Sequence, residues 1–260
     1  MRVRHANTLA RDEESVRPNP LGVIVGLLHP GEMGTAVGAA LSAAGHQVLW
    51  VSAGRSEATR VRAEAFTDAG TTAELCARAE AVFSVVPPHA ALEVAESLPQ
   101  FAGIYVDANA VSPATAARVG ATVDRFVDGG IIGGPPDPHI YFSGPEAPAV
   151  AALFAGSPVE ARLAADASAL KCAYAGWSKG SAALLLTMRA YAQATGVWDE
   201  LAAEWPPELH ESLASAERSA ERKGWRWIGE MEEIATGLAA ADLPPGFHEA
   251  AAKVYRGSNA

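Results

Sequence analysis

The first 165 residues alternate between short apolar runs and alanine-rich helical stretches, and this alternation constrains the fold more than any other feature of the chain. The apolar runs, which we expect to be strands, are residues 22–28, 47–52, 81–86, 104–107, 126–132, 140–143 and 159–163. The helical stretches between them are residues 33–44, 56–68, 73–78, 90–97, 112–122 and 147–154. Such alternation predicts right-handed βαβ units, and therefore an α/β fold with a parallel sheet wound on both faces by helices.

No strand pattern follows residue 165. A long apolar helix is predicted over residues 167–194, and Gly196, just beyond it, is the residue that stops the helix. Further helices are predicted at residues 198–204, 208–223, 225–241 and 247–255, with proline pairs at 206–207 and 244–245. The chain therefore reads as a Rossmann-type doubly wound sheet followed by an all-α region, and ligands of such sheets bind at the carboxyl ends of the strands.

The first expected strand leads directly into His29-Pro30-Gly31-Glu32-Met33-Gly34 and then into a helix. A dinucleotide-binding turn has the pattern G-x-G-x-x-G at this place, and Gly31 and Gly34 supply its second and third glycines. His29 stands at the first. The helix that begins here offers free N–H groups to a diphosphate. We predict that residues 29–34 bind a dinucleotide; the alternative is a glycine turn that binds nothing.

The end of the second strand indicates which dinucleotide. An NAD-binding sheet has Asp or Glu there to hold the ribose hydroxyls, but no acidic residue occurs from Gln47 to Ser56. Ser52, Arg55 and Ser56 suit a 2′-phosphate instead, because a guanidinium binds phosphate through two hydrogen bonds. NADP is therefore favoured over NAD, unless Arg55 is a solvated loop cation.

Two further strand ends are predicted to meet the coenzyme in the same cleft. Val86, Pro87 and Pro88 end the strand of residues 81–86 and are assigned to the nicotinamide ribose, although they would also serve as a plain strand terminator. Asn109 follows the strand of residues 104–107 and completes the expected coenzyme site.

Composition excludes several other kinds of protein. The formal net charge is −10, from 30 acidic and 20 basic residues, which disfavours binding to nucleic acid or anionic lipid. No apolar run approaches the ~20 residues of a membrane helix, and no secretory signal is present, so we expect a cytoplasmic protein. Cys76 and Cys172 are expected to be reduced thiols. No spacing typical of metal ligands occurs, so no metal is expected.

With these motifs in view, the chain resembles the β-hydroxyacid dehydrogenase superfamily, which includes 6-phosphogluconate dehydrogenase and 3-hydroxyisobutyrate dehydrogenase. The resemblance covers roughly residues 21–255, and its tail is similar to a phosphogluconate-dehydrogenase-like C-terminal domain of uncharacterised members. It rests on residues 31–34, 107–113 (DANAVSP), 128–134 (DGGIIGG), 177–180 (WSKG) and 229–235 (GEMEEIA), together with Lys171.

The resemblance implies NADP-dependent hydride transfer between the nicotinamide and a small hydroxy- or oxo-acid, with Lys171 as general acid and base. A lysine within the apolar helix of residues 167–194 is costly unless it faces a cleft, and its desolvation would lower its pKa toward neutrality. The alternative is a structural lysine whose ammonium reaches the surface. The resemblance also implies a homodimer through the helical region. We therefore expect a disordered leader (1–20), an NADP-binding domain (21–165) and a helical substrate and dimerisation domain (166–260).

The substrate half departs from the family pattern. Ala175 stands where the family has asparagine, Asn109-Ala110 replace a Ser-Thr pair, and Ile132 replaces a serine. The residues expected to meet the substrate are Asn109, Ala110, Gly133, Gly134, Lys171, Tyr174 and Lys179. Lys179 lies eight residues beyond Lys171, about 80° around the helix, so both are expected in one groove.

Three interpretations remain open for the parts of the sequence that depart from the pattern. The segment Trp225-Arg226-Trp227, followed by Glu230, Glu232 and Glu233, is interpreted as a packed helix with a solvated face, with a place in the substrate cleft as the alternative. Reduction of an imine instead of a carbonyl would use the same scaffold. A non-catalytic NADP-binding sensor or scaffold protein is the third possibility, because family residues are missing from the substrate half.

Overall fold

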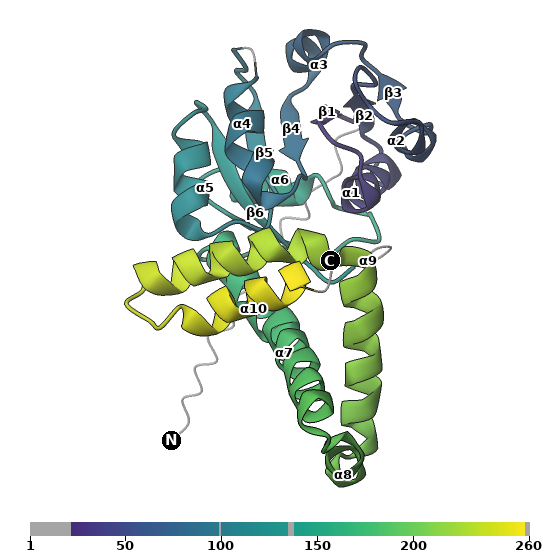
Figure 1. Ribbon diagram of the computed structural model, residues 1–260. Helices are drawn as coiled ribbons and strands as arrows, with labels where there is room; N and C mark the ends of the chain where they lie inside the picture. Colours follow the sequence, from purple (N-terminus) through teal and green to yellow (C-terminus); the bar gives the residue numbers. More distant parts are fainter. Residues whose placement is uncertain (1–21, 99, 135–137, 258–260) are drawn as a thin grey trace, which may run out of the picture.

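The computed structural model describes residues 22–98, 100–134 and 138–257, so the expected leader lies outside the described residues. Its centre is an eight-stranded sheet with the order β3-β2-β1-β4-β5-β6-β7-β8. Figure 1 labels the first six of these strands. The strands are β1 Ile24–Leu27, β2 Gln47–Trp50, β3 Thr67–Asp68, β4 Ala81–Ser84, β5 Ile104–Asp107, β6 Phe126–Ile132, β7 His139–Ser143 and β8 Ala161–Leu163.

Helices cover both faces of this sheet, as the sequence predicts. They are α1 Glu32–Ala43, α2 Glu57–Arg62, α3 Thr72–Arg78, the 3₁₀ turn η1 Pro88–Ala90, α4 Ala91–Glu96, α5 Pro113–Gly120 and α6 Ala147–Ala152. One buried cluster joins the sheet to α1 and α6, through Val37 and Val150. A second joins the opposite face to α3 and α5, through Leu75 and Val119. The expected Rossmann-type fold is confirmed.

The strand order places a cleft at the carboxyl ends of β1 and β4. The chain proceeds from β1 to β2 and β3 on one side, then returns to pair β4 with the other side of β1. Connections that leave β1 and β4 in opposite directions open a crevice between them, where doubly wound sheets bind their ligands. The segments at residues 29–34 and 85–88 both border this crevice.

The sheet differs from the expected wholly parallel one in a single pairing. β7 runs antiparallel to β6, with Ile131 opposite Ile140. Only six residues separate these strands, and a parallel pairing needs a crossover of a dozen or more. β8 then pairs parallel with β7.

The helix predicted over residues 56–68 is also shorter than expected. It ends at Arg62, and Thr67–Asp68 form the edge strand β3, where Thr67 pairs with Leu49 of β2. Ser56 caps the helix by accepting a hydrogen bond from the Thr59 N–H. The edge of the sheet offers the backbone of residues 67–68 hydrogen-bond partners that a longer helix would have supplied internally.

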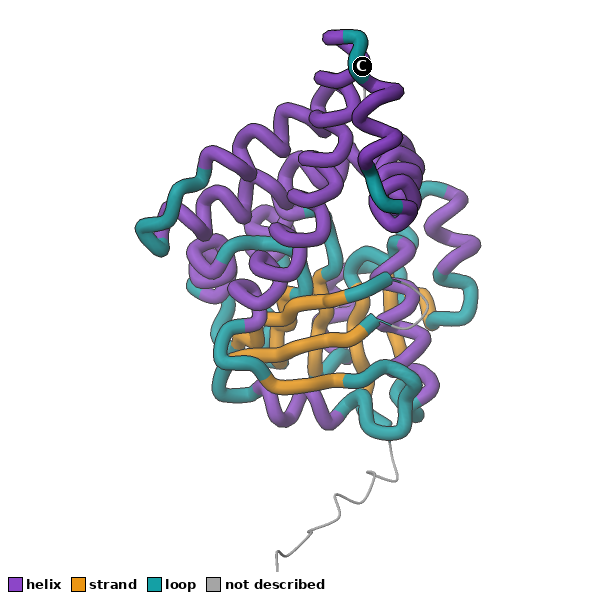
Figure 2. Tube along the Cα trace, turned by 90° about the horizontal axis from the view of Figure 1, so that it is seen from below, coloured by secondary structure: helices purple, strands orange, loops and turns teal. Residues whose placement is uncertain are grey.

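The C-terminal region is helical, and Figure 2 shows it stacked against one side of the strands. Its helices are α7 Ala167–Thr195, α8 Trp198–Glu204, α9 Pro207–Ala240 and α10 Gly246–Gly257. The two helices predicted for residues 208–223 and 225–241 are in fact one helix, α9. A glycine inside a helix costs only about 1 kcal/mol, so Gly224 does not end it. Figure 1 shows α9 bending sharply about halfway along, and Gly224 is at this midpoint.

The start of α7 is fixed to the sheet by hydrogen bonds from its first turn. The Asp128 carboxylate on β6 accepts the Ser168 N–H at 2.8 Å and the Ser168 hydroxyl at 2.6 Å. The Ala167 N–H donates to the Ser143 hydroxyl on β7 at 2.9 Å, and Asp166 caps the Ala169 N–H. N–H groups that a helix leaves unpaired at its start are thus satisfied by the sheet and by a capping residue.

Gly130 on β6 lets α7 approach the sheet at backbone distance. A β-carbon at this position would lie 2.6 Å from the Ala167 carbonyl oxygen and 3.2 Å from the Lys171 β-carbon. Because the first contact is with backbone, no side-chain rotation relieves it. The glycine therefore sets how closely Lys171 lies to the end of β6.

We predict that Gly130→Ala destabilises the protein by about 1–3 kcal/mol, because α7 must move away from β6. Chemical denaturation measures the change. Gly246→Ala is the matched control, since a β-carbon at Gly246 has nothing within 4 Å. Equal stabilities of the two variants would show that α7 is not held at this distance.

Candidate functional site

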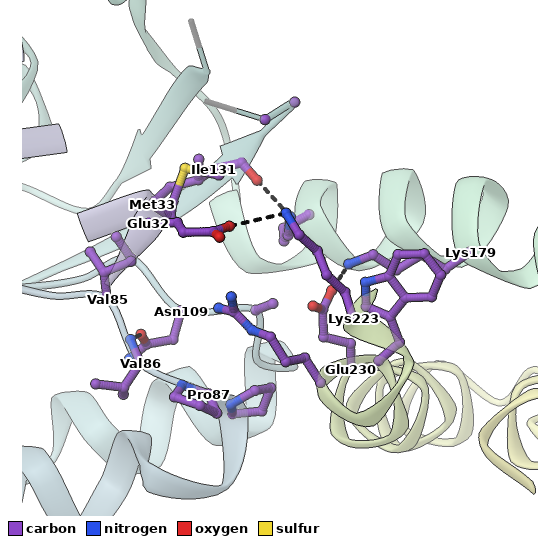
Figure 3. Close-up of a pocket in the computed structure, with 18 residues that line it drawn as sticks. Glu32, Met33, Val85, Val86, Pro87, Asn109, Ile131, Lys179, Lys223 and Glu230 are labelled. Atoms are coloured by element: carbon purple, nitrogen blue, oxygen red, sulfur yellow. Dashed lines mark hydrogen bonds and ion pairs between the residues drawn. The ribbon is translucent and has the colours of Figure 1, made fainter. Parts of the chain in front are cut away.

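A cleft of about 240 Å³ lies between the carboxyl ends of the strands and helices α7 and α9 (Figure 3). The sheet side contributes Glu32, Met33, Val85, Val86, Pro87, Pro88, Ala108, Asn109, Ala110, Ile131, Gly133 and Gly134. The helical side contributes Lys171, Lys179, Lys223, Arg226, Trp227 and Glu230. Its lining is rich in cations, although the whole chain is acidic.

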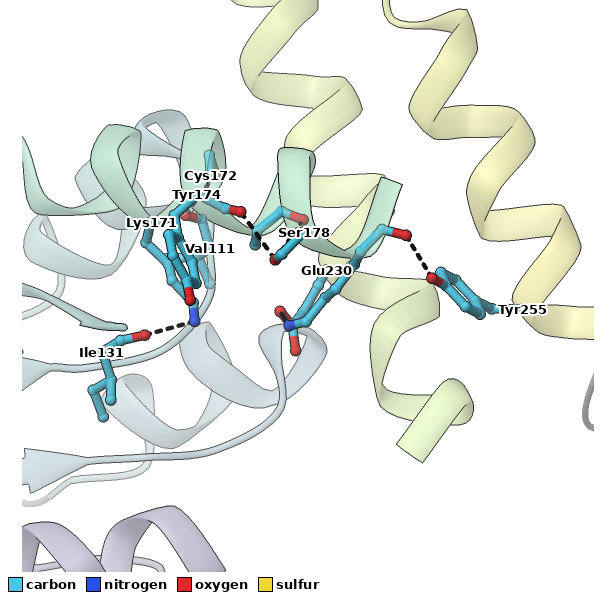
Figure 4. A network of polar contacts seen from close by, with 10 residues as sticks. Val111, Ile131, Lys171, Cys172, Tyr174, Ser178, Glu230 and Tyr255 are labelled. Carbon is cyan, nitrogen blue, oxygen red and sulfur yellow. Dashed lines mark hydrogen bonds and ion pairs between the residues drawn. The ribbon is translucent and has the colours of Figure 1, made fainter. Parts of the chain in front are cut away.

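Lys171 is positioned one turn after the fixed start of α7. Its ammonium group donates a 2.6 Å hydrogen bond to the Ile131 carbonyl at the end of β6 (Figure 4). Burial, and then the nearby charge of Lys179, lower the pKa of Lys171 to about 8. A lysine with this pKa holds or releases a proton near neutral pH, as general acid–base chemistry requires.

Lys179 lines the same cleft but is already paired. Its ammonium group forms an ion pair with the Glu230 carboxylate of α9 (Figure 3) and lies 5.6 Å from the centre of the Trp227 ring. The sequence expectation that Lys171 and Lys179 share one groove is consistent with both lining this cleft. A second ion pair spans the cleft between the two regions of the chain, with Lys223 Nζ 3.2 Å from Glu32 Oε2.

The loops after β4 and β5 are tied together by Asn109. Its side-chain carbonyl accepts the Val86 N–H at 2.6 Å, and its amide nitrogen donates to the Ser84 hydroxyl at 3.3 Å. The Asn109 N–H donates to Asp107, whose carboxyl is 1% exposed and has its pKa raised to about 7 by burial. Asn109 therefore holds the loops that border the cleft, and both ends of its amide have a protein partner.

The turn before α1 has the free backbone that a diphosphate needs. Gly31 caps α1 without any side-chain hydrogen bond to the first turn, and a β-carbon at Gly31 would have nothing within 4 Å. A β-carbon at Gly34 would lie 2.4 Å from the His29 carbonyl oxygen, so the third glycine of the motif serves close packing of helix on strand. These features fit the coenzyme expected from the sequence.

His29 and Arg55 border a second hollow, of about 270 Å³, between the end of β1 and α4; we name it the β1–α4 groove. The Arg55 guanidinium donates to the Leu28 carbonyl at 3.3 Å. Burial, and then the Arg55 charge, lower the pKa of His29 to about 4, so its imidazole is neutral at pH 7. Buried His29 Nδ1 and Arg55 Nε have no hydrogen-bond partner among the described residues, which suits a polar ligand in this groove.

The loop after β2 contains groups that the sequence analysis did not consider. Arg60 donates to the Ser52 carbonyl at 3.1 Å, which adds a second guanidinium beside Arg55. The Ser52 N–H donates to the Asp68 carboxylate at 3.2 Å, so an acid approaches from β3 although none occurs in the loop itself. The Ser56 hydroxyl accepts the Thr59 N–H at the start of α2.

The structure separates the predicted site residues into these places. The cleft brings together Glu32, Met33, Val86, Pro87, Pro88, Asn109, Ala110, Gly133, Gly134, Lys171 and Lys179. His29 and Arg55 line the β1–α4 groove, and Pro30, Gly31 and Gly34 form the turn between the two hollows. Tyr174 is 45% exposed and does not line the cleft.

The sequence analysis gave a place in the cleft only as the alternative for this part of α9. Arg226, Trp227 and Glu230 line the cleft, whereas the preferred interpretation was a packed helix with a solvated face. Lys223 joins them, and the spacing of residues 223, 226, 227 and 230 is that of one helix face. That spacing is the signal by which the sequence pointed to a shared surface.

Two family models each match a part of the chain. Residues 24–111 match the family model described as NADP oxidoreductase, coenzyme F420-dependent, and residues 190–258 match a domain of unknown function, DUF1932. A 28.5 kDa uncharacterised protein of Methanothermus fervidus is 35% identical over 135 residues. That alignment covers 49% of this chain and 54% of the relative, so the match spans about half the relative's length.

Solved structures align over nearly the whole chain. A conserved protein of unknown function, described as similar to 3-hydroxyacid dehydrogenases, is 25% identical, with a TM-score of 0.66 over 91% of this chain and 96% of its own. The 3-hydroxyisobutyrate dehydrogenase of Mycobacterium tuberculosis is 15% identical, with a TM-score of 0.64 over 91% and 94%. The chain has the hydroxyacid-dehydrogenase fold. A reductive aminase of Aspergillus terreus, solved with NADPH and ethyl levulinate, is 17% identical, with a TM-score of 0.55 over 91% and 93%.

These findings confirm the resemblance inferred from the sequence, and the family model that matches residues 24–111 is one of NADP oxidoreductases, in agreement with the expected coenzyme. In the described part of the chain, no helix is both long enough and apolar enough to cross a membrane.

We predict that Gly31→Ala weakens NADPH binding at least tenfold and leaves the free energy of unfolding within about 0.5 kcal/mol of wild type. The new methyl group has room in the fold but stands where backbone must approach the diphosphate. Fluorescence titration and thermal unfolding measure the two effects. Gly34→Ala is the comparison, because its methyl group meets the His29 carbonyl and destabilises the fold. Unchanged NADPH affinity in Gly31→Ala would contradict the assignment of this turn.

Proposed function

We propose that the protein is an NADP-dependent oxidoreductase that transfers a hydride between the nicotinamide and a small hydroxy- or oxo-acid. The observation that carries the proposal is the place of Lys171, whose ammonium group lies in the cleft at the carboxyl end of β6 and is held there by the Ile131 carbonyl. A buried lysine of lowered pKa at the ligand-binding edge of such a sheet is a candidate for proton transfer.

The residues that would hold NADP are distributed along the edge of the sheet. Residues 29–34 would bind the diphosphate at the start of α1, and Ser52, Arg55 and Ser56 would bind the 2′-phosphate, with Arg60 beside them. Residues 86–88, near Asn109, would contact the nicotinamide ribose. When bound, NADP supplies the group that accepts or donates the hydride.

Lys171 would move the proton that accompanies the hydride. In oxidation its neutral amine accepts the proton of the substrate hydroxyl, and in reduction its ammonium group returns a proton to the carbonyl oxygen. The hydrogen bond to the Ile131 carbonyl orients the lysine, and Gly130 allows the α7 backbone to lie close enough for that bond. The Lys179–Glu230 pair fills the adjacent wall of the cleft.

The pKa of Lys171 predicts opposite pH profiles for the two directions. Reduction needs the ammonium form, so its rate falls as the pH rises through about 8; oxidation needs the amine, so its rate rises over the same interval. Steady-state rates with NADPH or NADP⁺ between pH 6 and 10 measure both. Lys171→Met should lower kcat by about 10²–10⁴-fold. Lys171→Arg should retain the positive charge and lose the inflection near pH 8.

NADPH binding by Lys171→Met serves as the control, because the coenzyme should still bind to α1. The substrate panel includes 2-oxo-acids, 3-oxo-acids, a cyclic imine and coenzyme F420, the last because it is named in the matched family model. Turnover that survives in Lys171→Met would remove the lysine from the reaction. Turnover of the imine alone would establish the imine-reductase alternative, and NADPH binding without turnover on any substrate would favour the sensor.

We further propose that the protein forms a homodimer through α7. Five large apolar side chains of this helix are exposed, and they fall within an arc of about 100°. They are Tyr174, Trp177, Leu184, Met188 and Tyr191. A contiguous apolar stripe on a soluble protein is typical of an interface, and a twofold axis would place this stripe against its own copy.

We predict that the wild-type protein has about twice the mass of its 26.9 kDa chain in solution, and that Trp177→Glu combined with Leu184→Glu produces a monomer. Each glutamate would place a charge in an apolar contact. Light scattering measures the mass. Gln193→Glu adds a charge to the opposite side of the same helix and should leave the dimer intact. A monomeric wild type would overturn the proposal.

A further inference from the structure

Ion pairs account for only half of the cations in the cleft. Four cationic side chains and two carboxylates line it among the described residues. Lys179 is paired with Glu230, and Lys223 is paired with Glu32. The other two cations are Lys171 and Arg226, and the lysine is hydrogen-bonded to a backbone carbonyl.

Arg226 has no carboxylate within ion-pair distance in the described part of the chain. Its guanidinium carbon lies 5.9 Å from the centre of the Trp225 ring, and the side chain is partly buried in the cleft wall. Arg226 lines the cleft together with Glu32 and Lys171. A guanidinium that is partly withdrawn from water and lacks an anionic partner favours binding of an anion.

Among the described residues, the sheet side of the cleft has no side chain that is free to bind a carboxylate. The Asn109 amide, expected to bind a substrate carboxylate, is 2% exposed and donates to and accepts from other protein groups. Ala110, which lines the cleft, and Ala175 have no polar side chain, and Gly133 offers only backbone. No other side chain of the described cleft presents two parallel N–H donors, which is the geometry that matches a carboxylate.

We propose that Arg226 binds the anionic group of the substrate, a carboxylate, and so selects acids over uncharged carbonyl compounds. The identity of the reacting group rests on the proposed function, whereas the anion site itself does not. The side chain that binds the substrate carboxylate then lies on α9 of the helical region, across the cleft from the loops of the sheet. The reacting carbon of the substrate would then lie beside Lys171, between Arg226 and the nicotinamide near residues 86–88.

An anion on Arg226 would also affect proton transfer. The positive charge of Arg226 is one of the charges that lower the pKa of Lys171. A bound carboxylate neutralises that charge, so the pKa of Lys171 rises when the acid binds. The lysine is then more fully protonated in the substrate complex, which suits donation of a proton during reduction.

The first test compares an oxo-acid that the protein reduces with the ethyl ester of the same acid. Arg226→Gln should raise KM for the acid about 10- to 100-fold and change KM for the ester less than threefold. The KM of Arg226→Lys for the acid should lie between those of the wild type and Arg226→Gln, because an ammonium group keeps the charge but cannot form the paired contact. Arg218→Gln removes the same charge from an exposed position two turns earlier on α9 and is the matched control. Arg226→Gln should also move the inflection of the pH profile of kcat/KM upward, because that profile reports the enzyme before the acid binds.

The second test needs no turnover. Calorimetry measures the binding of oxalate and succinate to the wild type and to Arg226→Gln, each with and without saturating NADPH. The wild type should bind at least one dianion, and Arg226→Gln should lose at least tenfold in affinity. Arg226-dependent binding without turnover would uphold the anion site and leave the proposed function unsupported.

Other outcomes overturn the inference. Turnover with equal losses on acid and ester would leave the proposed function standing and remove Arg226 from substrate selection. Failure of the wild type to bind either dianion, or equal binding by Arg226→Gln, would also remove Arg226 from substrate binding. Weaker NADPH binding in Arg226→Gln, with dianion binding unchanged, would assign the arginine to the coenzyme.

Discussion

The contact between β6 and α7 determines the geometry of the whole site. Asp128 and Ser143 satisfy the first N–H groups of α7, and Gly130 lets the backbone of the helix approach the strand. Lys171 follows one turn later, so its position depends on this contact and on the register of β6 with β7. The same segment, residues 128–134, ends at the glycines that border the cleft. The strand β6 therefore joins the coenzyme half to the helical half.

The charge that lines the cleft is opposite in sign to the net charge of the whole chain. The chain carries a net charge of −10, yet the described cleft has twice as many cations as carboxylates. Two ion pairs, Lys179–Glu230 and Lys223–Glu32, hold α9 against α7 and α1. They leave the charges of Lys171 and Arg226 without a carboxylate. Field lines focused between low-dielectric walls would draw a small anion to this site.

Most of the fold and part of the site followed from local pattern. Apolar runs separated by helical stretches predicted the doubly wound sheet, because burial on both faces requires that pattern. The turn of residues 29–34 was identifiable because its glycines have separate physical tasks, and Gly34 indeed packs against the His29 carbonyl. Lys171 was identifiable because burying a charge within an apolar helix is costly unless its side chain faces a cleft.

The remaining features depend on tertiary contacts. The edge strand β3 exists because β2 offers it partners, and the antiparallel β7 depends on a short connection to β6. Gly224 suggested a break between two helices, but packing keeps α9 continuous through its bend. The role of Arg226 required the cleft itself, since its helix alone shows an ordinary polar face. Asn109 had the right chemistry for a ligand, but its partners Val86 and Ser84 become visible only when β4 and β5 lie side by side.

A crystal structure of the protein with NADPH bound tests the central claim most directly. The account predicts the coenzyme diphosphate against the first turn of α1, with the nicotinamide in the cleft between Val86 and Lys171. It also predicts that Lys171 stays close to the end of β6. A coenzyme that leaves this cleft vacant, or a Lys171 side chain directed away from the nicotinamide, would contradict the account.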